Sequence, residues 1–229
     1  MQTEILQLLE GARKASGLTV IIDVFRAFSV ACYAYNSGVT KIYPVSDIDQ
    51  AYRLKAKNPD YMLVGERNEK KPEGFDFGNS PSQLLAGNLS GKTMVHTTSS
   101  GTQGIANATG ADELITGSFV NAGAIIQYIE QRKPEKLSLV CMGYACSYPT
   151  DEDTFLAEYI KARLEKQPVD FEAMVEKLRT GSGARFFAPE KQEWAPSADF
   201  ELCLSLNRFN FVLKVEQENG RNYLKKIDL

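Results

Sequence analysis

The stretch "LTVIIDVFRAFSVACYAYNSG", residues 18–38, carries the pattern on which the fold prediction rests. Residues 18–24 form a short apolar run with β-branched side chains, which is typical of a buried strand. A helical pattern begins at residue 26 and stops at Gly38, a common place for a helix to end. A buried strand followed at once by a helix predicts a sheet whose strands are joined by helices.

The same unit recurs along the first two thirds of the chain. Helical patterns lie between most of the further apolar runs, and two of these helices are expected to stop before Pro59 and Pro134. The further strands are predicted at 39–45, 61–65, 92–98, 113–118 and 137–143. The sequence therefore predicts an α/β fold with a layered, mixed and largely parallel sheet flanked by helices.

The pattern changes after residue 150. Helices are predicted at 151–166 and 169–180, and a stretch rich in glycine and proline follows. The chain ends with two strand patterns joined by Asn219-Gly220, which is typical of a β-hairpin turn. We expect one domain over residues 1–229, with a C-terminal lobe at 150–229 that ends in a β-hairpin. A separate C-terminal domain is the alternative, but no linker is visible.

The composition excludes several classes of protein. Of 229 residues, 43% are hydrophobic, and the net charge of −3 gives no basic footprint for nucleic acid. The four cysteines form no CxxC pair, which favours a reduced protein of the cytoplasm. The charged N-terminus is unlike a signal peptide, and no apolar run is long enough to span a bilayer. We expect neither a nucleic-acid nor a membrane partner, and a homo-oligomer is compatible with the sequence.

Polar and charged residues follow nearly every predicted strand. In open α/β sheets, ligands bind beyond the carboxyl ends of the strands, so these residues are expected at one edge. They are Asp23 and Arg26, Glu66 and Arg67, "TTSSGTQG" at 97–104, Asn121, and "TDED" at 150–153. Their coincidence at one edge predicts a site there.

Two loops are predicted to form a binding site for an anion. "GFDFGNSPSQL" at 74–84 contains a capping box, Ser80-x-x-Gln83, with Pro81 at the first helical position. Helix amides behind a glycine-rich turn form an anion site. "TTSSGT" at 97–102 has the same character. The alternative for both loops is a helix that is capped for structural reasons alone.

The acids beside this anion site suit Mg²⁺, which prefers oxygen ligands. Asp23 ends an apolar strand, where a carboxylate is costly unless it is bound or paired. Glu66 follows another strand, and Asp153 opens a predicted helix, where helix capping is the alternative role. The single histidine, His96, lies within a predicted strand, which argues against a Ser-His-Asp hydrolase and a histidine phosphatase.

A series of motifs in one order resembles the 2-phosphosulfolactate phosphatase (ComB) family of coenzyme M biosynthesis. The most specific is "GFDFGNSP", and the series runs over residues 20 to about 205: "VIIDVFRA", "GER", "GFDFGNSP", "TTSSGT", "GSFVNA", "CMG", "EDTFLAEYI" and "GSGARF". The resemblance implies an α/β fold unlike those of the common phosphatases. It also implies Mg²⁺-dependent hydrolysis of (2R)-phosphosulfolactate, a small anionic phosphate ester, to sulfolactate and phosphate.

The residues and the resemblance together define an expected site. Asp23, Glu66 and Asp153 are expected to hold Mg²⁺ and to take part in catalysis. The attacking group is either a water molecule or a carboxylate, of which Asp23 is the first candidate. Substrate binding is expected from Arg26, Arg67, Asn79, Ser80, Thr97, Thr98, Gly101, Thr102, Asn121 and Arg185.

The sequence departs from the family pattern beside one anion loop. Ser100 replaces a usual asparagine, and Gln103 stands where an arginine is frequent. The loss of an arginine there leaves another small 2-phospho-hydroxy acid open as the substrate. A protein that binds an organic anion without catalysis is a further alternative, although binding alone would not need acids beside the anion.

Overall fold

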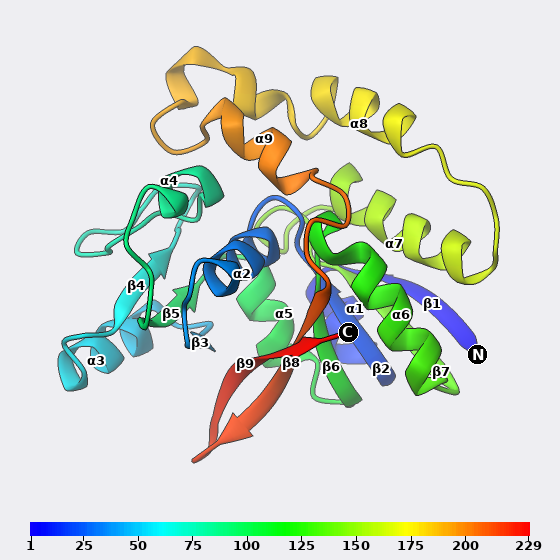
Figure 1. Cartoon of the computed structure of the whole chain (residues 1–229), viewed down its shortest axis with the longest axis horizontal. Coiled ribbons are helices and arrows are strands. Elements are labelled where there is room, and N and C mark those ends of the chain that lie inside the picture. The colour runs from blue at the N-terminus through cyan, green and yellow to red at the C-terminus, as the bar shows by residue number, and fades with distance from the viewer.

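One nine-stranded sheet organises the chain, and the computed structural model describes all residues from 1 to 229 (Figure 1). The strands follow the order β1-β7-β2-β6-β8-β9-β3-β5-β4 across the sheet. Their bounds are β1 (Gln2–Gln7), β2 (Gly17–Ile22), β3 (Lys41–Pro44), β4 (Met62–Gly65), β5 (Thr93–Thr97), β6 (Ala111–Gly117), β7 (Lys136–Cys141), β8 (Phe211–Glu218) and β9 (Arg221–Asp228).

The sheet consists of two parallel parts joined by the C-terminal hairpin. Strands β1, β7, β2 and β6 are parallel, and so are β3, β5 and β4. The hairpin β8–β9 lies between them and pairs antiparallel with β6 on one side and with β3 on the other. The last residues of the chain therefore hold the middle of the sheet.

Helices cover both faces of this sheet. Strand side chains alternate between the two faces, so Ile21 packs in a core with α1, α2 and α5, whereas Val20 and Ile22 pack in a second core with α6 and α7. The helices are α1 (Leu8–Lys14), α2 (Ala27–Asn36), α3 (Ile48–Lys57), α4 (Pro81–Leu85), α5 (Gly101–Asn107), α6 (Ala122–Arg132), α7 (Asp151–Leu164), α8 (Phe171–Thr180) and α9 (Ser197–Cys203).

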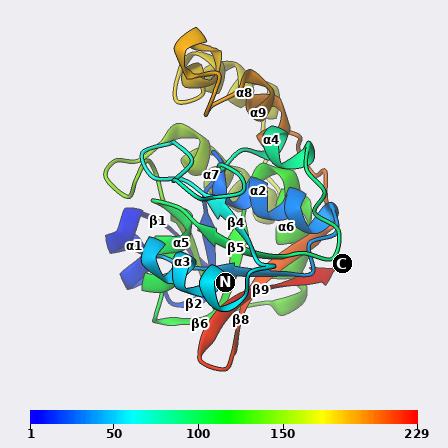
Figure 2. The same ribbon diagram turned by 90° about the vertical axis from the view of Figure 1, so that its left-hand side faces the viewer.

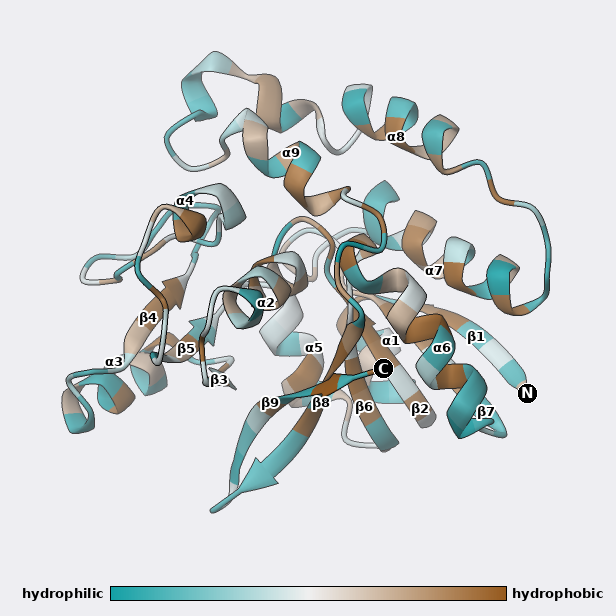
Figure 3. Cartoon of the chain, viewed as in Figure 1, coloured by the Kyte–Doolittle hydropathy of each residue, from teal (hydrophilic) through white to brown (hydrophobic).

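The hydropathy of the chain follows these layers. The inner parallel strands are mostly apolar, whereas β1 and the far end of the β8–β9 hairpin are hydrophilic, and α3, α6 and α8 carry hydrophilic residues (Figure 3). A third, smaller core packs α3 against β4 and β5 through Leu54, Leu63 and Val95. None of the helices combines the length and the apolar character that crossing a lipid bilayer requires.

Residues 171–203 form a cap that lies above the strand ends (Figure 2). The cap contains α8, the short 3₁₀ helices η2 (Ala184–Phe187) and η3 (Pro189–Lys191), and α9. A buried ion pair, 2.7 Å between Arg26 Nη1 and Asp199 Oδ2, ties α9 to the segment between β2 and α2. The cap thereby closes one side of the space beyond the carboxyl ends of the strands.

The predicted α/β class and the C-terminal hairpin are confirmed. The predicted strands all form, with bounds that differ by one to two residues. The features that were not predicted include the helices α1 and α9, the edge strand β1, and the position of the hairpin in the middle of the sheet. β1 is half-exposed and carries polar residues, so its apolar pattern is weak. The position of the hairpin depends on pairing with residues more than 90 positions away, which no local pattern encodes.

Because the hairpin lies in the middle of the sheet, we expect a buried residue of β9 to stabilise the whole fold. Leu224 is fully buried and lies opposite Ile42 of β3. We expect Leu224→Ala to lower the free energy of unfolding by about 2–5 kcal/mol, because it leaves a cavity between the two parts of the sheet. The matched control, exposed Lys225→Ala on the same strand, should cost less than about 0.5 kcal/mol. Equal losses in urea denaturation would contradict this role of the hairpin.

Candidate active site

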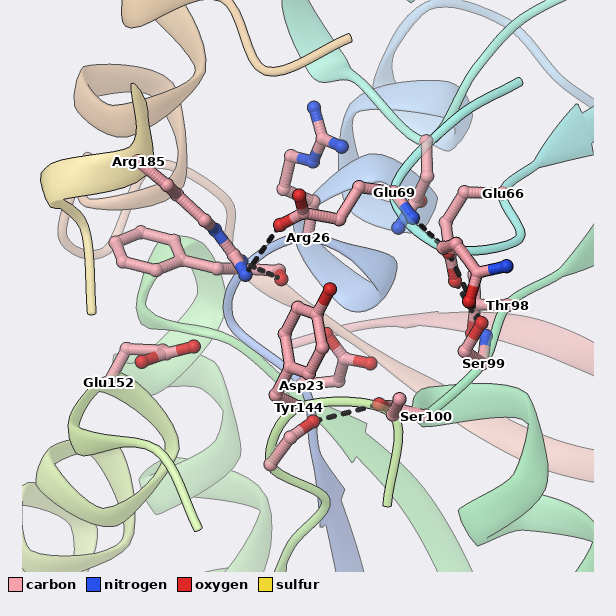
Figure 4. Close-up of a pocket in the computed structure, with 15 residues that line it drawn as sticks. Asp23, Arg26, Glu66, Glu69, Thr98, Ser99, Ser100, Tyr144, Glu152 and Arg185 are labelled. Atoms are coloured by element: carbon pink, nitrogen blue, oxygen red, sulfur yellow. Dashed lines mark hydrogen bonds and ion pairs between the residues drawn. The ribbon is translucent and has the colours of Figure 1, made fainter. Parts of the chain in front are cut away.

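A pocket lies beyond the carboxyl ends of the strands, where the sequence predicted a site. It holds about 510 Å³ of empty space, part of it open to solvent, and 15 residues line it. Figure 4 shows side chains from separate parts of the chain converging on this space. The lining residues are Asp23, Phe25, Arg26, Glu66, Asn68, Glu69, Asn79, Thr98, Ser99, Ser100, Gly143, Tyr144, Ala145, Glu152 and Arg185.

Asp23 stands directly after β2 and is 5% exposed. Its carboxylate joins two helix starts, because Ala27 N–H donates to Oδ1 at 3.1 Å and Gly101 N–H donates to Oδ2 at 2.7 Å. A Cβ at position 101 would lie 2.9 Å from Asp23 Oδ2, so only glycine allows this approach. Burial raises the pKa of Asp23 to about 6, and the nearby charges of Glu66 and Glu152 add to the rise.

Two neighbouring acids of α7 have different positions. Asp153 Oδ1 accepts from Val24 N–H at 2.8 Å, and Oδ2 accepts from Gly143 N–H at 2.9 Å, so this carboxylate ties the end of β2 to the end of β7. It lies behind the pocket wall. Glu152 lines the pocket, is 3% exposed, and its Oε2 has no hydrogen-bond partner. Burial raises the pKa of both carboxyls, and for Asp153 repulsion from Glu152 contributes.

Glu66 organises the loop after β5. Its Oε1 accepts from Ser99 N–H at 2.6 Å, and its Oε2 accepts from Glu69 N–H at 2.9 Å and from the Ser99 hydroxyl at 3.2 Å. Thr98 lines the pocket, whereas Thr102 lies behind it and its hydroxyl accepts from Thr98 N–H at 2.9 Å. Glu66 thus fixes the hydroxyl-rich loop that faces the pocket.

The arginines of the site are already paired. Arg26 Nη1 donates to Asp199 Oδ2 at 2.7 Å and to the carbonyl of Trp194 at 2.6 Å. Arg185 comes from the cap and donates to Glu69 Oε1 at 3.1 Å and to the carbonyl of Phe25 at 2.9 Å. Both residues line the pocket, and both already donate to protein acceptors.

The glycine-rich loop begins α4 at the predicted residues, but only one half of the predicted capping box forms. Ser80 is the N-cap with Pro81 after it, and its hydroxyl accepts from Gln83 N–H at 3.3 Å. The reciprocal half of the capping box, from Ser80 N–H to Gln83 Oε1, is absent, and the Gln83 NH₂ group donates to the carbonyl of Glu193 at 2.7 Å. Ser80 also donates to Asp199 Oδ1 at 2.9 Å, so it lies behind the pocket while Asn79 lines it.

Of the residues predicted for the site, the structure brings six to the pocket wall: Asp23, Arg26, Glu66, Asn79, Thr98 and Arg185. The others stand behind this wall or outside it: Arg67, Ser80, Thr97, Gly101, Thr102, Asn121 and Asp153. Arg67 donates to the Thr97 hydroxyl at 2.8 Å, and Asn121 Oδ1 accepts from Ser118 N–H at 3.2 Å.

The sequence placed the segments that contain Glu152 and Ser99 at this edge but did not single these two residues out, and it did not predict Glu69 and Tyr144 as lining residues. A signal for Glu152 existed, because it stands four residues before buried Leu156 and eight before Ile160, on the buried stripe of α7. Asp153 shares that stripe, so spacing alone does not tell which acid faces the pocket. Glu69 and Tyr144 come from irregular loops, where no periodic pattern exists.

The donor set fits Mg²⁺, although no group of three or more acid, histidine or cysteine side chains is placed to enclose a metal. Mg²⁺ keeps several waters and is held by one or two carboxylates together with substrate phosphate oxygens. Asp23 and Glu152 match this demand, since both are buried, both have raised pKa values, and Glu152 Oε2 has no partner. A cation would offset the repulsion between these groups.

The raised pKa of Asp23 makes stability depend on pH in metal-free buffer. Its folded-state value of about 6 exceeds the ordinary 3.8, so its favourable contribution is complete below 3.8 and is lost as pH rises through about 6. We therefore expect the unfolding free energy of the wild type to fall relative to that of Asp23→Asn between about pH 4 and pH 7. Urea denaturation in EDTA measures both proteins. A difference that does not change with pH would show that the Asp23 charge is not desolvated.

Comparisons with known proteins show the family of this chain. The family model described as 2-phosphosulpholactate phosphatase matches residues 4–218. A probable 2-phosphosulfolactate phosphatase of Bacillus subtilis is 32% identical over 203 residues, which cover 88% of each chain. Another, from Caldanaerobacter subterraneus, is 30% identical over 86% of this chain and 87% of its own. One from Thermotoga petrophila is 39% identical over 64% of this chain and 62% of its own. The chain belongs to the 2-phosphosulpholactate phosphatase family.

Proposed function

We propose that this protein is a Mg²⁺-dependent phosphatase that hydrolyses (2R)-phosphosulfolactate to sulfolactate and phosphate. The family membership and the names of the relatives support the reaction. The observation that carries the metal dependence is the charge of the pocket wall. Four carboxylates line it, Asp23, Glu66, Glu69 and Glu152, against two guanidinium groups, Arg26 and Arg185.

This balance of charge is unfavourable for the proposed substrate on its own. Phosphosulfolactate carries a phosphate, a sulfonate and a carboxylate. Arg26 and Arg185 already interact with Asp199 and Glu69, which reduces the positive charge that they offer. A divalent cation at Asp23 and Glu152 would cancel the excess negative charge of the wall and so allow an anionic ester to bind.

We assign Asp23 and Glu152 as the residues that would hold Mg²⁺, with Glu66 and Asp153 adding negative charge nearby. When bound, the ion would polarise a phosphoryl oxygen as a Lewis acid. Both oxygens of Asp23 already accept backbone hydrogen bonds, which weakens Asp23 as a nucleophile. A water molecule is therefore the attacking group. Asp23 holds the starts of α2 and α5 in place and would hold the cation.

The other residues of the wall bind and orient the substrate. Arg185 of the cap and Arg26, which contacts the cap through Asp199, suit the sulfonate and carboxylate, because these groups bind guanidinium groups through paired oxygens. Thr98 and Asn79 offer neutral hydrogen-bond donors, whereas the Ser100 hydroxyl already donates to the carbonyl of Gly143 at 2.8 Å. In phosphoryl transfer, positioning and charge stabilisation supply most of the catalysis, and these residues supply both.

Release of inorganic phosphate from (2R)-phosphosulfolactate tests the proposal. We expect activity with Mg²⁺, loss in EDTA and recovery on adding Mg²⁺ back. Asp23→Asn and Glu152→Gln should each lower kcat by at least ~10²-fold, about 2.7 kcal/mol of transition-state stabilisation. Asp151→Asn is the matched control, because Asp151 is the exposed neighbour of Glu152 and does not line the pocket. Full activity in EDTA, or equal losses in all three variants, would contradict the proposal.

One observation favours a second substrate. Gln103 replaces a frequent arginine, and its side chain donates to the carbonyl of Ser46 at 2.8 Å instead of lining the pocket. The site therefore has fewer cationic groups than the family pattern supplies. In the same assay, a higher kcat/KM for a small 2-phospho-hydroxy acid without a sulfonate would identify that ester as the substrate.

A further inference from the structure

His96 is the one histidine of the chain, and the function proposed above does not use it. It lies in β5, is fully buried and does not line the pocket. Its Nε2 stands 3.1 Å from Oδ1 of Asn79, which does line the pocket. Its Nδ1 is buried and has no hydrogen-bond partner. Burying a ring nitrogen without a hydrogen-bond partner costs free energy of folding. A histidine at this position therefore points to a role for its contact with Asn79.

The unpartnered Nδ1 determines which nitrogen carries the proton. Burial lowers the pKa of His96 to about 3, so the ring is neutral near pH 7 and carries one N–H. A proton on Nδ1 would bury an N–H donor with no acceptor, which proteins avoid more strongly than an acceptor with no donor. The proton therefore resides on Nε2, and Nε2–H donates to Asn79 Oδ1.

This hydrogen bond fixes the polarity of the Asn79 amide. An asparagine side chain has an acceptor and a donor of nearly the same shape, so a half-turn of the amide exchanges them at little steric cost. With Oδ1 held by His96, the NH₂ group is the free end. Asn79 Nδ2 donates to no protein acceptor and is not among the buried unpartnered atoms, so it reaches the open space of the pocket.

We propose that His96 is a positioning residue that holds the Asn79 amide with its NH₂ group toward the pocket, where it donates to an anionic oxygen of the bound phosphate or sulfonate. This inference rests on the proposed function, because it assumes an anionic substrate in the same pocket. Without His96 the amide can turn and present Oδ1, a partial negative charge, to the anion.

A variant series separates this role from simple packing. His96→Leu removes the donor, whereas His96→Gln keeps an amide donor at a similar reach. We expect His96→Leu to weaken binding of inorganic phosphate, measured by calorimetry with Mg²⁺ present, by about ten-fold, the value of one hydrogen bond to a charged group. His96→Gln should restore most of it. Wild-type affinity in His96→Leu would overturn the proposal.

A double-mutant cycle with Asn79→Ala tests whether His96 acts through Asn79. Asn79→Ala should weaken phosphate binding by about as much as His96→Leu, and the double variant should be no weaker than Asn79→Ala alone. Additive losses would show that His96 supports the fold independently of Asn79, which would overturn the proposal. Because phosphate binding needs no turnover, this result does not depend on whether phosphosulfolactate is the substrate.

The wild-type protein provides a measurement that needs no variant. With ¹⁵N-labelled histidine, the NMR spectrum contains the ring of His96 alone. We expect the neutral tautomer with the proton on Nε2, at pH 7 and with or without phosphate. A proton on Nδ1 alone would make Nε2 an acceptor, turn the Asn79 NH₂ group toward His96 and overturn the proposal even if both variants failed to fold.

Discussion

Three carboxylates buried at one edge of the sheet form the constraint on which the rest of the structure depends. Asp23, Glu152 and Asp153 are each no more than 5% exposed, and buried like charges of this kind are strongly unfavourable without compensation. Backbone amides supply part of it, from the starts of α2 and α5 to Asp23 and from the ends of β2 and β7 to Asp153. These bonds fix the strand ends and helix starts relative to one another. Glu152 Oε2 has no hydrogen-bond partner, and we propose that a bound cation supplies the compensation that is missing there.

The topology of the chain puts the cap over this edge. After the cap, the chain enters β8 in the middle of the sheet, so the position of α9 is set by the sheet itself. Asp199 on α9 then accepts from Arg26 and from Ser80 and Ser82 of the glycine-rich loop. Arg185 of the cap reaches Glu69 and the carbonyl of Phe25. The central hairpin, the cap and the anion loops are therefore parts of one connected structure.

Local sequence patterns predicted the features that interactions between near neighbours in the chain determine. The apolar run before Asp23, the cap at Ser80 and the turn at Asn219-Gly220 each act over a few residues, and each forms as predicted. The insertion of the hairpin between β6 and β3 depends on long-range pairing, and the choice of Glu152 over Asp153 at the pocket wall depends on the rotation of α7 against the sheet. The partner of His96 is 17 residues away in the sequence, so its contact with Asn79 required the folded chain.

The central claim is that the buried acids hold a divalent cation beside the anion loops. Diffraction from crystals soaked in Mn²⁺ and inorganic phosphate, recorded for the anomalous signal of manganese, tests it most directly. The account predicts one strong peak in the pocket, within about 2.2 Å of a carboxylate oxygen of Asp23 or Glu152, with phosphate oxygens completing its coordination. Phosphate bound in the pocket with no manganese peak there, or a peak bonded to neither carboxylate, would contradict it.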